Sequence, residues 1–417
     1  MRMLPEFFPI RYPFPQFPHA IDAIHAAMAG FTATIVGSTS TLAVTSDAVS
    51  TGCPSYGNPY DGNMTFTLID EAHYDAEMDG KVLPALDACV TEGWMDPATV
   101  DWNGDELPKL DEPGQLHYCC YDAHAFDALR EDGASAAFRG AIVISHGFTE
   151  FARKYSEMAW YFLLAGYSVC ILEHRGHGHS AHDVSNPSLV WIDDWRRYVA
   201  DFAAFADTVG REYACGGPLN LYCHSMGGGI GAAVMEHYPS LFDKAVLSAP
   251  MIAPVVGMPT WIARIATGAL CGLGFGKARV FGHTDFSPEL DLDEHEGASE
   301  ARVRWFHKQR VDDVACQTNA ATFEWAHQAM ALSRAVLKPD MCGAIETPTL
   351  LFQAGRDVWV LNGPQDDFVE RVREGGGSIE KIRYGKSLHE IFSMPNTVVG
   401  PYVNKILDFL SAPADSL

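Results

Sequence analysis

Two features are missing from this sequence: a long apolar run and an excess of positive charge. No stretch of about 18 consecutive apolar residues occurs, which argues against a transmembrane helix. The 417 residues include 29 lysines and arginines against 53 aspartates and glutamates, a formal charge of −24. This balance argues against binding nucleic acid, or an anionic membrane surface, through bulk charge.

Cysteine pairs at metal-binding spacing are also missing. The ten cysteines are scattered, without a CxxC pair, and several fall inside apparent strands. Such a distribution is typical of buried thiols in a reducing compartment. Cys53 is the exception, because residues 50–53 faintly resemble a lipoprotein cleavage site.

Residues 1–60 contain little that predicts a folded unit. Residues 1–18 are rich in proline and phenylalanine, and residues 20–49 are rich in alanine. Residues 27–44 imitate the apolar core of a signal peptide, but the segment before them is too long for its basic region. We interpret residues 1–60 as a poorly ordered or loosely packed extension. The expected location is cytoplasmic, with secretion or membrane anchoring through this extension as the alternative.

Strand-like and helix-like segments alternate over residues 61–250 and again over residues 343–417. The run at 140–145 is almost uniformly apolar, as expected of a strand buried on both faces of a parallel sheet. The alternation predicts an α/β fold in which helices flank a mostly parallel sheet. Further strands are predicted at 115–122, 168–173, 218–223, 245–249, 347–353 and 379–384, and helices at 79–92, 192–211, 226–237, 364–374 and 399–410.

Residues 251–342 interrupt this alternation. They show little strand pattern, contain many glycines and methionines, and include an acidic cluster at 289–300. We therefore divide the chain into an extension (1–60), a first core part (61–250), a helical cap insertion (251–342) and a second core part (343–417). An insertion between two strands of the sheet is the natural place for a lid over the strand ends.

A single serine separates the strand predicted at 218–223 from the helix predicted at 226–237. This arrangement indicates a nucleophile elbow, a sharp turn that exposes a serine hydroxyl at a helix N-terminus. The turn requires small neighbours two residues away on each side, and Cys223 and Gly227 occupy those positions. The usual motif has glycine at both, so Cys223 is a departure. In the alternative interpretation, Ser225 only caps the helix.

Ser225, Asp357 and His389 each follow a predicted strand, in the chain order of an α/β-hydrolase triad. Because function collects beyond the carboxyl ends of parallel strands, we expect the three to meet there. We predict Ser225 as nucleophile, His389 as general base and Asp357 as the residue that orients the imidazole. The backbone N–H groups of Phe148 and Met226 are the predicted oxyanion donors. This mechanism requires no cofactor.

Three histidines, His174, His177 and His179, have a spacing open to metal ligation. Gly176 and Gly178 between them favour a tight turn that lines the pocket. No carboxylate cluster completes a site in the sequence, so no metal site is predicted.

Three motifs resemble the lysophospholipase L2 and monoacylglycerol lipase group of α/β-hydrolases, often labelled by its serine aminopeptidase S33 domain. They are residues 145–150 (SHGFTE), 173–180 (EHRGHGHS) and 224–228 (HSMGG), and the similarity covers about residues 114–410. The resemblance implies an α/β-hydrolase fold, with Ser225, Asp357 and His389 as nucleophile, acid and base. It places the oxyanion loop at 146–148 and implies that His146, Gly147 and His224 line the substrate site.

The leading functional hypothesis is hydrolysis of carboxylic esters of fatty acyl lipids through an acyl-enzyme. The substrate would be a small lipid ester such as a lysophospholipid or monoacylglycerol, and transient contact of the cap with a membrane surface is compatible with it. One alternative is an S33-type aminopeptidase in which residues 289–300 bind a free α-amine; another is a non-catalytic binding protein with a hydrolase fold. Acyl chain length, head group and oligomeric state stay open. The apolar residues that open the insertion could shelter an acyl chain, and they are Met251, Ile252, Val255, Val256, Met258, Trp261 and Ile262.

Overall fold

The computed structural model describes residues 67–127 and 137–413 and contains one large sheet. Its strand order is β1-β2-β4-β3-β6-β7-β9-β10, with β1 and β2 antiparallel to their neighbours and all other pairs parallel. The predicted mostly parallel sheet is thereby confirmed. The strands are β1 (Val90–Met95), β2 (Leu116–Tyr121), β3 (Ala141–Ser145), β4 (Ser168–Leu172), β6 (Leu219–His224), β7 (Lys244–Ser248), β9 (Thr349–Ala354) and β10 (Ile379–Tyr384).

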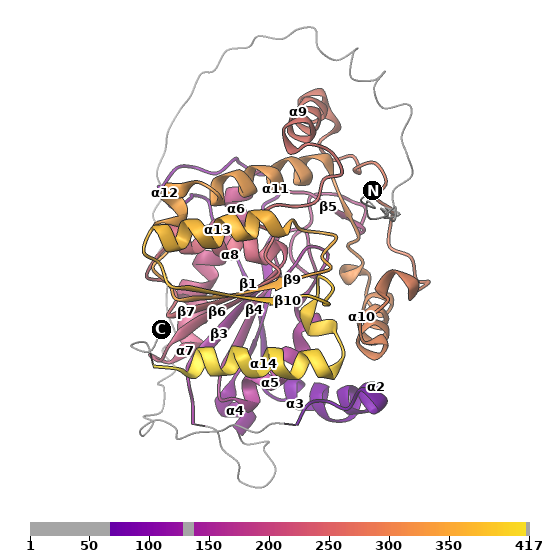
Figure 1. Ribbon diagram of the computed structural model, residues 1–417. Coiled ribbons are helices and arrows are strands. Elements are labelled where there is room, and N and C mark those ends of the chain that lie inside the picture. Colours follow the sequence, from indigo (N-terminus) through magenta and orange to yellow (C-terminus); the bar gives the residue numbers. More distant parts are fainter. Residues whose placement is uncertain (1–66, 128–136, 414–417) are drawn as a thin grey trace, which may run out of the picture.

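Helices cover both faces of this sheet (Figure 1). One face carries α2 (Tyr74–Glu77), α3 (Leu83–Asp87), α4 (Ala123–Asp127), α5 (Ser156–Leu164) and α14 (Asn396–Ser411). The other face carries α6 (Trp195–Phe205), α7 (Arg211–Ala214), α8 (Met226–His237) and α13 (Asn362–Glu374). A hydrophobic core lies on each face of the sheet. Strand β3 contributes to both, because Ile142 and Ile144 pack on the first face and Val143 on the second. Such burial on both faces explains why the parallel strands read as continuous apolar runs.

Two predicted elements differ from the structure. The helix expected over 79–92 ends at Asp87, and its last predicted residues begin strand β1. The helix expected over 192–211 is α6 followed by a wider helical turn, Ala206–Gly210, and the short α7. The predicted extension, residues 1–60, lies outside the described residues, as does Cys53. The nine cysteines within them are all free and seven are buried, which confirms the thiol prediction there.

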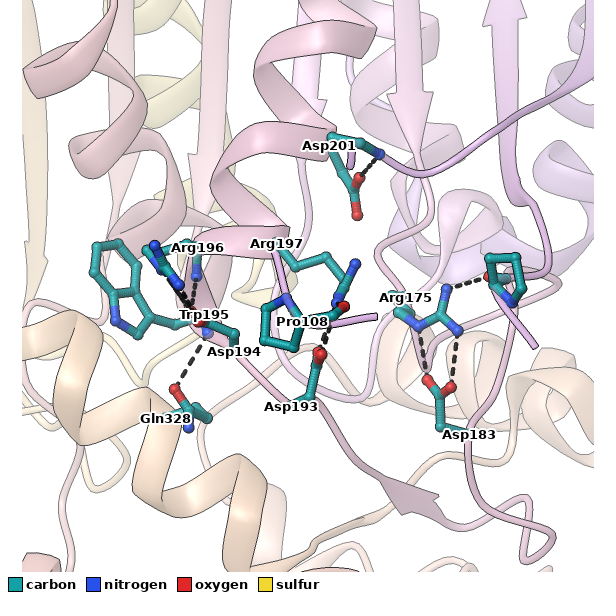
Figure 2. A network of polar contacts seen from close by, with 12 residues as sticks. Pro108, Arg175, Asp183, Asp193, Asp194, Trp195, Arg196, Arg197, Asp201 and Gln328 are labelled. Atoms are coloured by element: carbon teal, nitrogen blue, oxygen red, sulfur yellow. Dashed lines mark hydrogen bonds and ion pairs between the residues drawn. The ribbon is translucent and has the colours of Figure 1, made fainter. Parts of the chain in front are cut away.

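Two buried arginines form hydrogen bonds with the connection between β1 and β2 (Figure 2). Arg175, whose side chain is fully buried, donates to the carbonyl oxygen of Pro113. Arg197 at the start of α6 donates to the carbonyl oxygen of Pro108 at 2.7 Å. Each guanidinium also pairs with an aspartate, Arg175 with Asp183 and Arg197 with Asp193. Charge-assisted bonds of this kind fix the turn after β4 and the start of α6, both of which support the strand ends.

The chain between β7 and β9, which corresponds to the predicted insertion, is mainly helical and lies over one edge of the core (Figure 1). Helix α11 packs against α8 of the core and against α9. Strand β8 (Ala320–Ala321) pairs with β5 (Leu189–Val190). Neither these helices nor any other helix in the described part of the chain has the length and hydropathy of a membrane span. The helices of the insertion are α9 (Thr260–Leu270), α10 (Glu300–Asp312), α11 (Phe323–Val336) and α12 (Pro339–Cys342).

Candidate active site

Ser225 occupies a sharp turn between β6 and α8. Its backbone has φ 52° and ψ −119°, a conformation that a residue with a side chain rarely adopts. The surrounding chain holds this turn, since the Ser225 N–H donates to Ser248 at 3.1 Å and its carbonyl oxygen accepts from Met251 at 2.7 Å. The side chain therefore stands at the N-terminus of α8, as a nucleophile elbow requires.

The elbow depends on glycines where α8 lies against the sheet. A Cβ added to Gly227 would lie 2.0 Å from the carbonyl oxygen of Ser145, so no side chain fits there. Gly231 explains how Cys223 is accommodated, because a Cβ at Gly231 would lie 2.4 Å from the Cys223 Sγ. The larger residue at position 223 is thus accommodated by the absence of a side chain at Gly231 in α8.

We expect Gly231→Ala to destabilise the protein by about 1–3 kcal/mol, because the new methyl group overpacks against the Cys223 sulfur. In a Cys223→Ala background the nearest remaining atom of that residue is Cβ at 3.6 Å, so the same substitution should cost less. Urea unfolding of the four proteins gives the coupling energy between the two sites. Gly363→Ala is the matched control, because nothing lies within 4 Å of its added Cβ. Equal costs of Gly231→Ala in both backgrounds would contradict the explanation.

The structure brings Ser225, His389 and Asp357 into one hydrogen-bonded chain. His389 Nε2 lies 2.7 Å from Ser225 Oγ, and its Nδ1 lies 2.7 Å from Asp357 Oδ2. The Asp357 side chain is fully buried, and its Oδ1 accepts from the N–H groups of Trp359 at 2.9 Å and Val360 at 3.0 Å. An aspartate fixed in this way favours the tautomer in which Nδ1 carries the proton and Nε2 accepts. The arrangement can remove a proton from the serine hydroxyl.

The two predicted oxyanion donors have unused N–H groups. In the described ranges, neither the Phe148 nor the Met226 backbone N–H donates to another protein group. The neighbouring Gly147 N–H is occupied, because it donates to Glu150 Oε2. The Phe148 ring packs on Trp325 of the insertion at 4.0 Å between centroids. The N–H groups of Phe148 and Met226 are therefore free to bind an oxygen atom, whereas that of Gly147 is not.

A buried lysine links the oxyanion loop to the histidine loop. Lys154 Nζ lies 2.7 Å from Glu150 Oε1 and 2.6 Å from Glu390 Oε1, with its side chain 3% exposed. Burial by itself lowers the pKa of Lys154, but the two carboxylates outweigh it and raise that pKa. Glu150 binds the Gly147 N–H, and Glu390 is the residue after His389. Lys154 and Glu390 were not singled out from the sequence, because nothing local distinguishes them from surface charges.

His146 and His224, expected to line the substrate site, are buried beneath it instead. His146 Nε2 accepts from the His174 N–H at 2.9 Å, and its Nδ1 lies 2.8 Å from the Gly147 oxygen. His224 Nδ1 bonds the Ser248 oxygen at 3.1 Å, and its ring packs beside His389. Burial lowers the pKa of His224 to about 4, so its ring is neutral at physiological pH. Both side chains are buried and form hydrogen bonds with the surrounding loops.

The three histidines of residues 174–180 do not converge. His174 and His177 are buried beside His146, whereas the His179 side chain is 46% exposed. The predicted tight turn is present, with φ 80° at Gly176 and 52° at Gly178. No metal site is formed by these three residues together.

The amino-acid sequence is similar to those of known hydrolases. The family described as serine aminopeptidase, S33, matches residues 136–396. Lysophospholipase L2 of Escherichia coli K12 is 28% identical over 287 residues, which cover 65% of this chain and 80% of that protein. Monoacylglycerol lipase of Mycolicibacterium smegmatis is 33% identical over 128 residues, covering 31% of this chain and 44% of the lipase.

Solved structures show the same fold. A soluble variant of the monoglyceride lipase of Saccharomyces cerevisiae, in complex with a substrate analog, superposes with a TM-score of 0.54 at 18% identity. It covers 76% of this chain and 96% of its own length. A carboxyl esterase of Bacillus coagulans gives a TM-score of 0.54 at 16% identity, covering 77% and 98%. The chain belongs to the serine aminopeptidase S33 family of α/β-hydrolases.

Proposed function

We propose that this protein is a serine hydrolase that cleaves carboxylic esters of fatty acyl lipids, of the lysophospholipid or monoacylglycerol type. The observation that carries the proposal is the chain Ser225–His389–Asp357 beside two unused N–H donors. The relatives named lysophospholipase L2 and monoacylglycerol lipase support this substrate class. The alternative is cleavage of peptides, because the matching family is described as a serine aminopeptidase.

The reaction proceeds in two halves. His389 takes the proton of Ser225 as Oγ attacks the ester carbonyl, and Asp357 stabilises the imidazolium that forms. The Phe148 and Met226 N–H groups receive the oxyanion, each contributing about 3 kcal/mol to transition-state stabilisation. The tetrahedral intermediate collapses as His389 protonates the leaving alcohol, which leaves the fatty acyl group on Ser225. Water activated by His389 then releases the acid and restores the enzyme.

A small apolar cavity lies beside Met226, one of the two oxyanion donors. Met226, whose N–H is one donor, contributes its side chain to the cavity wall. Trp325, which packs on Phe148, also lines it. The cavity measures only about 10 Å³, room for about one water molecule, so an acyl chain enters it only if lining side chains such as Trp325 move. The lining residues are Ile192, Trp195, Tyr198, Met226, Met251, Trp325, Gln328, Ala329 and Leu332.

The substrate class is tested by the rates on p-nitrophenyl esters of increasing acyl length. Each added methylene that is buried contributes up to about 0.8 kcal/mol, so kcat/KM should rise by at least about tenfold from acetate to a medium-length chain. Aminoacyl-naphthylamides are the parallel substrates and should not be cleaved. Activity confined to acetate would remove the lipid proposal, and amide cleavage without ester turnover would favour the aminopeptidase.

The insertion presents an exposed apolar face, and we assign it the role of cap. Trp261 and Ile265 are 65% and 62% exposed and lie one turn apart on α9. Trp359, beside Asp357, is 63% exposed, and its carbonyl oxygen accepts from the Val255 N–H at 2.8 Å. Exposed apolar side chains are thus present both on α9 and two residues from Asp357. Because the chain carries a charge of −24, contact with a lipid surface would be made through these side chains rather than through charge.

Substituting Trp261 and Ile265 together with alanine should lower turnover of monoacylglycerol presented in vesicles by about tenfold, because apolar contact with the surface is lost. Hydrolysis of dissolved p-nitrophenyl acetate should be unchanged. The control is the pair Val311→Ala and Val314→Ala, which removes exposed apolar side chains elsewhere in the insertion. An equal loss on both substrates, or none on either, would argue against surface contact by α9.

The acidic cluster at 289–300 gives the aminopeptidase alternative no support. Its carboxylates are exposed, and Glu300 pairs with Arg304 on α10 at 2.6 Å. They form a solvated surface.

A further inference from the structure

Outside the catalytic site, two histidines and a glutamate point at one another. The Nδ1 atoms of His117 and His179 lie 3.0 Å and 3.4 Å from the same oxygen, Oε2 of Glu173. One ligand atom from each of the three lies within 4.8 Å of the others. His117 comes from β2, Glu173 follows β4, and His179 belongs to the turn after it. Glu173 is buried, with its side chain 2% exposed.

The outer nitrogens of both histidines also face carboxylates. His117 Nε2 lies 3.9 Å from Glu92 Oε2, and His179 Nε2 lies 3.0 Å from Asp313 Oδ2. A histidine that binds a metal through Nδ1 carries its proton on Nε2, and protein metal sites generally give that proton a carboxylate or carbonyl acceptor. His179 has this arrangement, because Asp313 lies at hydrogen-bond distance, whereas Glu92 is too far from His117 Nε2 for a direct hydrogen bond.

Within the described ranges, no lysine or arginine pairs with these carboxylates. Among residues 67–127 and 137–413, the ion-pair partners of Glu173, Glu92 and Asp313 are histidines alone. A second cluster, Glu150, His224 and Glu390, differs in this respect, because Lys154 Nζ lies between its two carboxylates. Among the described residues, the carboxylates of the first cluster have no such lysine between them.

We propose that His117, Glu173 and His179 bind a divalent transition-metal ion, with Zn²⁺ the best match. Tetrahedral zinc with bonds of 2.0–2.2 Å places its ligand atoms about 3.3–3.5 Å apart, close to the 3.0 Å and 3.4 Å separations here. Two imidazoles and a carboxylate suit this ion. The partly exposed His179 leaves a side open for water as the fourth ligand.

The proposed site links the insertion to the core. His117, Glu173 and His179 belong to the core, whereas Asp313 follows α10 of the insertion. A metal ion that fixes the His179 ring also fixes the bond from His179 to Asp313. Zinc should therefore raise the temperature of thermal unfolding as well as bind, since it binds the folded chain. The inference does not depend on the proposed ester hydrolysis.

The test is isothermal titration of the full chain, prepared without a polyhistidine tag and stripped with EDTA, using zinc chloride near neutral pH. We expect one zinc ion per chain and a higher unfolding temperature. His179→Ala should abolish this binding, and Asp313→Asn should weaken it by about tenfold. His73→Ala is the matched control, because His73 forms an exposed pair with Asp70 at 2.8 Å. It should bind as wild type does.

Two results would overturn the proposal. One is an absence of stoichiometric zinc binding in the wild type, which would mean that only hydrogen bonds and ion pairs hold the cluster together. The other is binding that persists unchanged in both His179→Ala and Glu173→Gln. Because His179 is half exposed, loss of binding in its variant should come with an unchanged circular dichroism spectrum, which separates a lost ligand from a lost fold.

Discussion

Replacing Ser225 with alanine should lower kcat on a dissolved short-chain ester by about 10⁶-fold, the loss seen when a serine nucleophile is removed from a comparable triad. In the proposed mechanism the Ser225 hydroxyl carries the acyl intermediate. His389 and the two oxyanion donors would remain, so a residual rate of about 10³–10⁴ over water is expected. Steady-state kinetics, with stability checked by urea unfolding, provide the measurement.

Ser240→Ala is the control for this substitution, because Ser240 is an exposed serine just beyond α8. It should retain the wild-type kcat. If Ser225→Ala retained more than about a hundredth of the activity while Ser240→Ala behaved as wild type, another residue would be the nucleophile.

Asp357→Asn should lower kcat by about 10⁴-fold with little change in fold. Asp357 Oδ1 accepts two backbone N–H groups, so the asparagine would keep its oxygen there and turn its NH₂ group toward His389. His389 would then hold its proton on Nε2 and could not accept one from Ser225. Single-turnover kinetics with a p-nitrophenyl ester would show the loss in the acylation step.

Asp367→Asn is the matched control, because Asp367 is exposed on α13 and outside the triad. A loss below about tenfold for Asp357→Asn would mean that another group orients His389, and the role assigned to Asp357 would be wrong.

The central part of the fold could be predicted from the sequence because its signals are local. Strands β3 and β4 are short apolar runs, and the helix predicted over 226–237 has the bounds of α8. Strand β1 was missed because it lies at the edge of the sheet, where polar and apolar residues mix: its Trp94 is 52% exposed. An edge strand lacks the continuous apolar run that marks a central one.

The candidate site divides in the same way. Ser225, Asp357 and His389 could be chosen because each follows a strand, and parallel strands end at one edge. The salt bridge from Lys154 to Glu390 joins residues 236 positions apart, and no local pattern indicates such a pair. The burial of His146 and His224 is likewise a property of packing, since a histidine beside a motif can face the substrate or the core. The structure also explains how the elbow accepts Cys223 in place of glycine: Gly231 has no side chain that would collide with its sulfur.

The most direct test of the account is covalent labelling with a fluorophosphonate, read by intact mass. Wild-type protein should gain one adduct, located on Ser225 by peptide mapping, because His389 activates that hydroxyl. Ser225→Ala should gain none. An adduct that persists in Ser225→Ala would contradict the assignment of Ser225 as the nucleophile. A folded wild-type chain that stays unlabelled would also contradict it and would favour a non-catalytic binding protein.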